Sequence, residues 1–214
     1  MTLDLFQQGG VGAEQLASGT SLLHGFVSDQ AGALLADIAR VETEAPFRQM
    51  VTPGGHSMSA FMTNCGPLGW TTDRSGYRYT SCDPVTGRPW PAMPEGFRAL
   101  AREAAQKAGY PNFDTDACLI NRYLPGSRMG LHQDRNEQDY GAPIVSVSLG
   151  LPVVFLFGGL RRNDKPLRLT LNNGDVLVWG GPDRLRYHGV NTLKPGCHEL
   201  TGNCRINLTF RKAS

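Results

Sequence analysis

The sequence lacks long apolar runs and paired cysteine motifs. No stretch of its 214 residues is long and apolar enough to span a bilayer. The start, Met1-Thr2-Leu3-Asp4, has neither the basic segment nor the apolar stretch of a secretory leader. The five cysteines form an odd set without a Cys-x-x-Cys pair, which favours neither a disulfide framework nor a structural zinc site. We therefore expect reduced thiols, a cytoplasmic protein and no membrane partner.

A strong excess of one charge is also missing. The net charge of +2 is far from the basic footprint of a dedicated nucleic-acid-binding domain. Its distribution is uneven, however, because residues 1–119 carry 8 basic and 12 acidic residues, whereas residues 120–214 carry 13 and 7. A basic second half suits a polyanionic substrate, although ordinary solvated faces would give the same count.

Two amphipathic helices are predicted in the first half of a single domain, residues 1–214. The first begins at a cap formed by Ser28-Asp29 and ends before Pro46. The second begins at Pro94 and stops at Gly109 in a left-handed conformation. Apolar residues recur at helical spacing in both: Leu34, Leu35, Ile38 and Val41 in the first, and Phe97, Leu100, Ala101, Ala104 and Ala108 in the second.

From Ala117 onward the sequence indicates β structure. Short apolar runs are separated by turn signals, among them the Asn-Gly pair in residues 172–175. Several short strands with regular turns favour a barrel or jelly roll over a parallel α/β sheet. The predicted strands are 118–123, 144–149, 153–157, 167–171, 175–179 and 205–210.

Residues 47–90 differ in character from the segments on either side. Short strand-like pieces, such as residues 57–62, are broken by glycine and proline, which indicates an excursion from the core. The segment carries Trp70, Tyr77 and Tyr79. These aromatic residues could belong to a core or form a stacking surface for a nucleic-acid base.

A candidate metal site begins at His132-Gln133-Asp134. Positions i and i+2 of a strand or strand end point to the same side, so His132 and Asp134 can share one metal ion. His188, which closely follows the strand-like residues 175–179, is the candidate third ligand. Two histidines and one carboxylate form the facial triad of non-haem Fe(II) oxygenases. The His-x-Asp pattern alone arises by chance in about one sequence in four of this composition, so it depends on independent context.

The C-terminal strand supplies that context. Polar residues occupy every second position of residues 205–211, so Arg205, Asn207, Thr209 and Arg211 share one face. An edge strand with a wet face would show the same alternation. Two guanidiniums on one face, however, can hold a dicarboxylate through charge-assisted hydrogen bonds. Together with an open metal triad, this clamp points to 2-oxoglutarate as cosubstrate.

These residues stand in a chain that resembles the AlkB-type Fe(II)/2-oxoglutarate-dependent dioxygenases, which reverse alkylation damage in nucleic acids. The resemblance covers nearly the whole chain. It implies a mainly β (α+β) fold, in which a double-stranded β-helix (jelly roll) core at 117–214 carries flanking helices and an N-terminal nucleotide-recognition lid at about 47–90. The matching stretches are residues 46–55, 68–72, 118–123, 131–134, 143–151, 158–160, 178–181, 187–189 and 207–211.

The resemblance also implies a role for particular residues. It makes His132, Asp134 and His188 the iron ligands. It makes Trp70 and His132 the two sides of a sandwich around a flipped, damaged base. Arg205 is expected at the distal carboxylate of 2-oxoglutarate and Arg211 nearer the metal. The full implied 2-oxoglutarate site is Asn121, Tyr123, Arg205, Asn207 and Arg211, and the further residues implied to bind substrate are Tyr77, Thr52, Met62, Asn136 and Arg162.

Two positions depart from the pattern of the bacterial family. Asn136 stands where the family usually carries an acid that faces the exocyclic amine of the target base. His56 stands where the family usually has an aromatic hydroxyl after Gly-Gly. Neither change touches the iron ligands, so both bear on the preferred lesion and strand type.

The activity implied by the resemblance is oxidative demethylation of N-alkylated bases such as 1-methyladenine and 3-methylcytosine. It uses Fe(II), 2-oxoglutarate and O2 and releases formaldehyde and succinate. The implied partner of the monomeric enzyme is alkylated single-stranded DNA, with double-stranded DNA and RNA as further candidates. Two alternatives share the fold: a hydroxylase of a small molecule or protein, which needs no base-stacking residues, and a non-enzymatic jelly-roll binding protein, in which Arg205 and Arg211 are surface charges.

Overall fold

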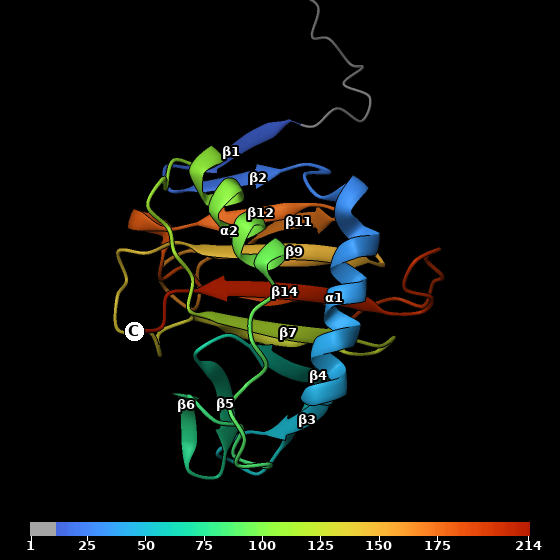
Figure 1. Cartoon of the computed structure of the whole chain (residues 1–214). Coiled ribbons are helices and arrows are strands. Elements are labelled where there is room, and N and C mark those ends of the chain that lie inside the picture. Colours follow the sequence, from blue (N-terminus) through green and yellow to red (C-terminus); the bar gives the residue numbers. More distant parts are fainter. Residues whose placement is uncertain (1–11) are drawn as a thin grey trace, which may run out of the picture.

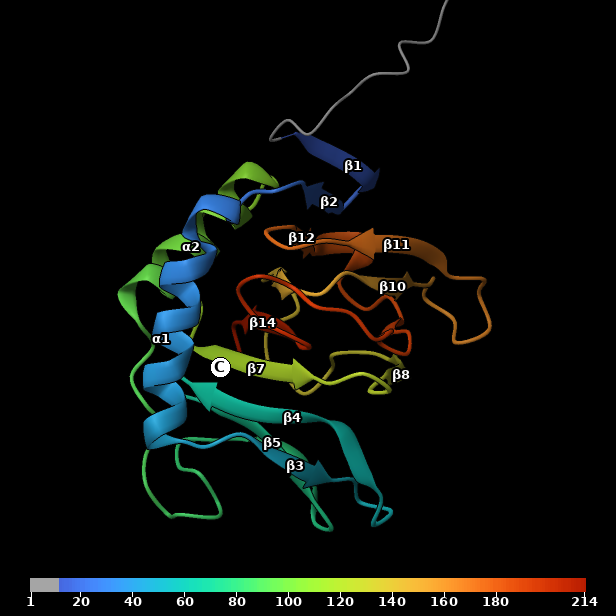
Figure 2. The same ribbon diagram turned by 90° about the vertical axis from the view of Figure 1, so that its right-hand side faces the viewer.

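The computed structural model describes residues 12–214. Residues 1–11, and with them the Met1-Thr2-Leu3-Asp4 start, lie outside the described residues. Two antiparallel sheets face each other, and two helices cover the outer face of the larger sheet (Figures 1 and 2). The predicted mainly β jelly roll with flanking helices is therefore confirmed. None of the helices in the described part of the chain is long and apolar enough to cross a membrane.

The larger sheet has eight strands in the order β1-β2-β12-β9-β14-β7-β4-β3. The strand β14 lies at its centre, paired with β9 on one side and β7 on the other. The strands of this sheet are β1 (Ala13–Ala17), β2 (Thr20–Leu23), β3 (Arg48–Val51), β4 (Ser57–Cys65), β7 (Ala117–Tyr123), β9 (Ile144–Gly150), β12 (Val176–Trp179) and β14 (Arg205–Arg211).

The smaller sheet has the order β11-β10-β13-β8. Its strands are β8 (Met129–His132), β10 (Val153–Phe157), β11 (Leu167–Leu171) and β13 (His188–Val190). The chain crosses between the sheets at Gly150 and again at the Asn172–Asp175 turn, where Gly174 has a φ of 86° that only glycine adopts without strain. The predicted Asn-Gly turn is therefore present, but it joins strands of different sheets.

Two helices pack on the large sheet, α1 (Ala31–Glu44) and α2 (Glu95–Lys107). Ser28 does not cap α1 as predicted: residues Ser28–Gln30 form a 3-10 turn, and no side chain caps the helix. The predicted ends hold better. The helix α1 ends two residues before Pro46, and Gly109, with a φ of 91°, follows α2.

Alternation along the central strands gives the large sheet two different faces. Ile206, Leu208 and Phe210 of β14 lie in the core shared with α1 and α2. The opposite face of β14 turns toward the small sheet, whose Phe155 and Phe157 belong to a second buried cluster. The predicted division of β14 into an apolar and a polar face is therefore confirmed, and the polar face lies between the two sheets.

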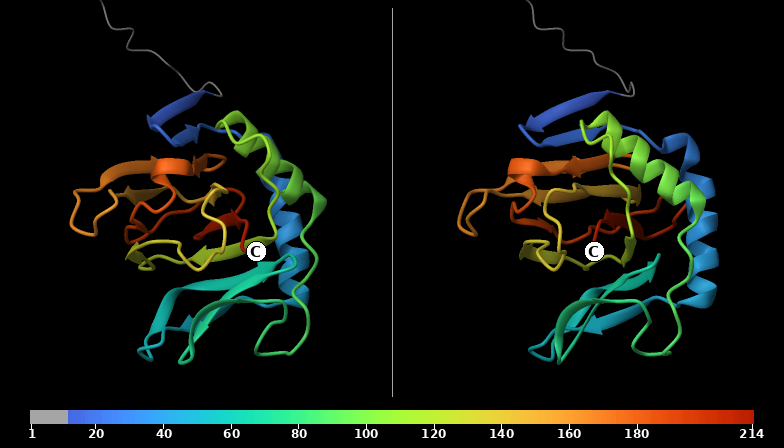
Figure 3. Two further views of the ribbon diagram at one scale, coloured as in Figure 1. Left: turned by 90° about the vertical axis from the view of Figure 1, so that its left-hand side faces the viewer. Right: turned by 60° about the vertical axis from the view of Figure 1, so that its left-hand side comes forward.

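The segment 47–90 is only in part an excursion. The strand β4 pairs with β7 and extends the large sheet, so the predicted break from the core does not occur there. The strands β5 (Gly69–Asp73) and β6 (Gly76–Thr80) form a separate two-stranded hairpin. This hairpin lies with β3 at the end of the molecule opposite β1 and β2 (Figures 1 and 3).

Candidate active site

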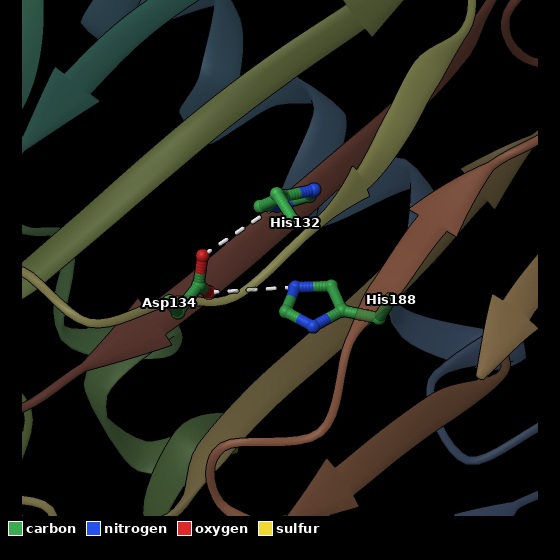
Figure 4. Close-up of side chains that lie close together, drawn as sticks. All are labelled: His132, Asp134 and His188. Carbon is green, nitrogen blue, oxygen red and sulfur yellow. Dashed lines mark ion pairs between the residues drawn. The ribbon is translucent and has the colours of Figure 1, made fainter. Parts of the chain in front are cut away.

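The three predicted metal ligands lie together between the sheets. His132 ends β8 and His188 begins β13, and the two residues are direct partners in the register of these strands. Asp134 follows β8 and bridges them: its Oδ1 lies 3.6 Å from His132 Nε2 and its Oδ2 3.7 Å from His188 Nε2 (Figure 4). The three ligand atoms all lie within 4.8 Å of one another. This spacing allows one ion to contact all three.

Burial and neighbouring charges give the triad the protonation states that are needed to bind a cation. Burial alone would raise the pKa of Asp134, but the Arg211 guanidinium, and then His188 and His132, hold that pKa well below its ordinary value. Burial lowers the pKa of His188 to about 4, so its imidazole is neutral at pH 7 and can donate a lone pair to a metal. Each histidine also has a ring partner: Nδ1 of His132 contacts the Gly130 carbonyl at 2.9 Å, and Nδ1 of His188 contacts the Arg186 carbonyl at 3.0 Å. These bonds leave Nε2 as the coordinating nitrogen in both rings.

The predicted 2-oxoglutarate residues form the floor of the same cavity. Arg205 is fully buried, and only its Nη2 has a partner, the Ser148 hydroxyl at 2.8 Å. Its Nε and Nη1 have no hydrogen-bond partner. Burial lowers the pKa of Arg205 to about 10. Unpaired buried guanidinium donors are costly, and a carboxylate ligand would satisfy them.

Arg211 lies at the other end of this floor. Its Nη2 and Nε donate to Asp134 Oδ2 at 2.6 and 2.9 Å. Between the two arginines, Asn121 Nδ2 donates to Asn207 Oδ1 at 3.3 Å, while Asn121 Oδ1 stays unpaired. Tyr123 is buried beside them, and burial raises its pKa to about 12, so it remains a neutral phenol.

Aromatic and sulfur side chains form the outer wall. The cavity has a volume of about 470 Å³. Trp70 and Tyr77 of the β5–β6 hairpin stack with ring centroids 5.7 Å apart and planes 22° from parallel. Tyr77 is 47% exposed and Asn136 lies at the cavity edge, so this wall faces the solvent. The cavity is lined by the metal triad, all five predicted 2-oxoglutarate residues, Thr209 of the polar face of β14, and Trp70, Tyr77, Met62 and Asn136, together with Met58, Leu119, Met129, Gly130, Gln133, Arg135, Ser146, Phe155, Trp179 and Val190.

Two predicted substrate residues are not part of the cavity wall. Thr52 lies in the turn before β4, where its hydroxyl accepts the His56 backbone N–H at 3.2 Å. Arg162 is exposed in the loop between β10 and β11, with its guanidinium carbon 5.8 Å from the ring centre of Tyr187. Both positions can meet a substrate only outside the cavity.

Not all basic residues of the second half of the chain are available to a polyanionic substrate. Arg184 is buried and Arg122 pairs with Glu42 at 2.6 Å. The exposed members are Arg128, Arg135, Arg161, Arg162, Lys165 and Arg168.

Three polar residues that hold the segments around the triad in place were not predicted in this role. Gln133 Nε2 donates to the Leu185 carbonyl at 2.6 Å and so ties the His132–Asp134 segment to the segment that leads to His188. Arg184 donates to the Asp134 carbonyl at 2.8 Å. Glu137 accepts from Arg184 at 3.1 Å. A charged residue gives no local sign that it will be buried, so no pattern marked Arg184 or Glu137.

Two imidazole nitrogens and one carboxylate on one side of an ion fit Fe(II) with positions left open. The unpaired donors of Arg205 fit the carboxylate of a bound acid. A jelly roll with these two features is the architecture of a 2-oxoglutarate- and Fe(II)-dependent oxygenase. Residues 19–211 match the 2OG-Fe(II) oxygenase superfamily, and the chain belongs to that superfamily.

Within the superfamily, the chain is similar over almost its full length to dioxygenases named AlkB. Identity is 58% over 211 residues with "Alpha-ketoglutarate-dependent dioxygenase AlkB" of Escherichia coli (strain K12), covering 99% of this chain and 98% of the relative. It is 43% with the AlkB homolog of Caulobacter vibrioides (strain NA1000 / CB15N), covering 94% of each chain. The solved structure of OsALKBH1 aligns with a TM-score of 0.83 at 29% identity and covers 94% of this chain and 100% of its own. The protein is thus an AlkB-type dioxygenase.

Proposed function

We propose that this dioxygenase restores N-alkylated nucleic-acid bases by oxidative demethylation. The reaction takes one O2 and one 2-oxoglutarate and yields succinate, CO2, formaldehyde and the unmethylated base. The observation that carries the proposal is the position of the Trp70–Tyr77 stack, which lines the same cavity as His132 and Asp134. A planar base that enters between this wall and the triad would bring its N-methyl group close to the three residues that would hold Fe(II). Stacking on an aromatic ring suits every base.

Each group of residues around the cavity has its own role in the proposed reaction. His132, Asp134 and His188 would hold Fe(II), which together with 2-oxoglutarate activates O2 for oxidation of the methyl carbon. Arg205 would bind the distal carboxylate of 2-oxoglutarate through its unpaired donors. Arg211 holds Asp134 Oδ2, which leaves Oδ1 free to face the ion. Because the base must reach a buried site, it leaves its stack first.

The proposed partner is alkylated single-stranded DNA, with 3-methylcytosine and 1-methyladenine as representative lesions, and with double-stranded DNA and RNA as further substrates. The exposed Arg135 lines the cavity and supports a phosphate backbone at its rim. Residues 47–90 would act as the nucleotide-recognition lid and 117–214 as the catalytic core. We propose a monomer in the cytoplasm. All five cysteines are free thiols, which suits a reducing compartment.

The two alternatives fare differently. In a non-enzymatic binding protein Arg205 and Arg211 would be surface charges, but both are buried. A hydroxylase of a small molecule or protein would keep the triad, yet it has no use for an exposed aromatic stack above it. The stack therefore favours a nucleic-acid base as substrate.

The deciding experiment measures formaldehyde and succinate release with single-stranded DNA that contains one 3-methylcytosine. Unmethylated DNA of the same sequence and a sample without DNA serve as controls. We expect formaldehyde in stoichiometric relation to succinate with methylated DNA alone. Equal succinate release with all three samples would refute a nucleic-acid substrate while leaving the oxygenase chemistry intact.

A further inference from the structure

A chain of buried polar contacts leads from the β5–β6 hairpin to the metal-binding carboxylate. The Tyr79 hydroxyl of β6 donates to Glu137 Oε1 at 2.6 Å. Glu137 Oε1 also lies 3.5 Å from Arg211 Nε. Arg211 in turn donates to Asp134 Oδ2. The hairpin that carries Trp70 and Tyr77 is thus connected to Asp134 through two intermediate side chains.

A second branch reaches the same residue from its backbone. Arg184 Nη2 donates to Glu137 Oε2 at 3.1 Å, while its Nη1 donates to the Asp134 carbonyl at 2.8 Å. Asp134 is therefore held at its carboxylate by Arg211 and at its carbonyl by Arg184, and Glu137 is the shared counterion of both arginines. The Glu137 side chain is only 1% exposed. Burying a charged carboxylate between two guanidiniums costs desolvation energy, and only ion pairs and hydrogen bonds of good geometry offset that cost.

The hydrogen bond from Tyr79 determines how strongly Glu137 competes with Asp134 for Arg211. With Tyr79 in place, Glu137 Oε1 accepts a hydrogen bond from the hydroxyl and remains 3.5 Å from Arg211 Nε. Without it, that oxygen has Arg211 as its remaining partner and competes with Asp134 Oδ2 for the same Nε–H. Removing the hydroxyl therefore draws Arg211 away from the metal-binding carboxylate.

We propose that Glu137 is a positioning residue that couples the β5–β6 hairpin to the metal site, so that a base held by the hairpin and a metal held by Asp134 strengthen each other's binding. The substrate half of this inference rests on the proposed function. Coupling of two sites is reciprocal, so oligonucleotide should tighten metal by the same factor by which metal tightens oligonucleotide.

The first test measures the dissociation constant of Mn²⁺ for the whole chain by calorimetry, without oligonucleotide. Tyr79→Phe removes only the hydroxyl, and we expect it to weaken Mn²⁺ binding about threefold or more, since the Glu137 contact is lost. Tyr110→Phe is the matched control, because Tyr110 also loses a single hydroxyl bond, to the Gly19 carbonyl at 2.9 Å, outside the cavity. Equal Mn²⁺ affinity in the two variants would overturn the proposal.

The second test repeats the Mn²⁺ titration with a saturating five-nucleotide single-stranded DNA that carries a central 3-methylcytosine. In the native protein we expect this DNA to tighten Mn²⁺ about fivefold or more. The ratio of the Mn²⁺ dissociation constants without and with DNA measures the coupling. In Tyr79→Phe and in Glu137→Gln this ratio should lie closer to one than to the native ratio. Glu103→Gln, on the exposed side of α2, is the control for the second variant.

The outcomes separate the inference from the proposed function. A native ratio below about two, or a native ratio retained in Tyr79→Phe, overturns the coupling even if the DNA binds and is demethylated. Absence of DNA binding, seen by fluorescence anisotropy, contradicts the proposed substrate and the coupling together, and the first test then decides the role of Glu137 at the metal. If Glu137→Gln fails to fold, Tyr79→Phe carries both tests.

Discussion

The indole Nε1 of Trp70 lies 3.2 Å from Asn136 Oδ1 and donates a hydrogen bond to it. An indole N–H can only donate, so it fixes the orientation of the amide: the oxygen faces Trp70 and the NH2 group is free for another partner. Because Asn136 lines the cavity edge, that partner can be the base. An uncharged donor therefore stands where the family usually carries an acid.

This orientation predicts that Asn136→Asp raises kcat/KM for 3-methylcytosine relative to 3-methylthymine. The carboxylate would accept from the exocyclic amine of the cationic lesion, whereas the amide of the native chain can donate to the carbonyl of the neutral one. At an effective dielectric near 20 the difference is on the order of 1–3 kcal/mol. The two lesions are compared in the same single-stranded sequence. An unchanged or reversed ratio would show that lesion choice depends on other residues, such as His56 and Tyr77.

Loss of any metal ligand is predicted to abolish turnover while the protein stays folded. His132→Ala and His188→Ala remove one ligand each, and His198→Ala, which lies outside the cavity, is the control. Asp134 needs more care because Arg211 and Arg184 both bind it, so Asp134→Asn is preferred to Asp134→Ala, which would leave the buried Arg211 short of a partner. Formaldehyde release and circular dichroism are measured on the same samples. Near-native release would remove that residue from the metal site.

Arg205→Ala is predicted to weaken 2-oxoglutarate by about 10²-fold, because a buried charge-assisted pair typically contributes a few kcal/mol. DNA affinity should hardly change, since Arg205 lies on the cavity floor. Arg205→Lys retains a charge but loses the planar fork, and we expect an intermediate affinity. Calorimetric titration of 2-oxoglutarate in the presence of Mn²⁺ measures both. Native affinity in the alanine variant would refute the clamp.

The sequence predicted the polar face of β14 because alternation in a strand is a local property that needs no partner. It also placed His132 and Asp134 on one side of a strand end, as Figure 4 shows. The strands β8 and β13 were not predicted. They are only four and three residues long, and they exist because His132 and His188, 56 positions apart, become register partners. Such short strands depend on pairing that no local pattern encodes.

Which charged side chains are buried could not be predicted from the sequence either. Arg184 is one of the basic residues counted in the second half of the chain, but it is buried beside Asp134 because Glu137 and two carbonyls satisfy its guanidinium. The burial of Arg184 depends on partners elsewhere in the fold.

Trp70→Ala is predicted to lose about 1–3 kcal/mol of binding to methylated single-stranded DNA with little change in the salt dependence. Stacking involves no counterions, whereas each phosphate contact releases about 0.7 of one for a single strand. Arg161→Ala, in the exposed loop after β10, should instead lower the slope of DNA affinity against salt concentration. Fluorescence anisotropy over a range of salt concentrations distinguishes the two. Affinity that does not depend on salt in the native protein would favour a small-molecule substrate.

Finally, the metal-free protein is predicted to lose stability as the pH falls from 7 to 5, in part through His188. Burial lowers the pKa of His188 to about 4, whereas an unfolded histidine titrates near 6.5. Above pH 6.5 the imidazole is neutral in both states. Between about pH 6.5 and 4 only the unfolded chain takes up the proton, so the free energy of unfolding falls, by about 2 kcal/mol at pH 5. The ordinary carboxylate pKa values, about 3.9 to 4.3, lie below the lower pH of the measurement. Urea unfolding at pH 7 and pH 5, with a chelator present, measures the loss, and His188→Gln should lose correspondingly less. An equal loss in the variant and the native protein would mean that His188 does not stay neutral when the protein is folded.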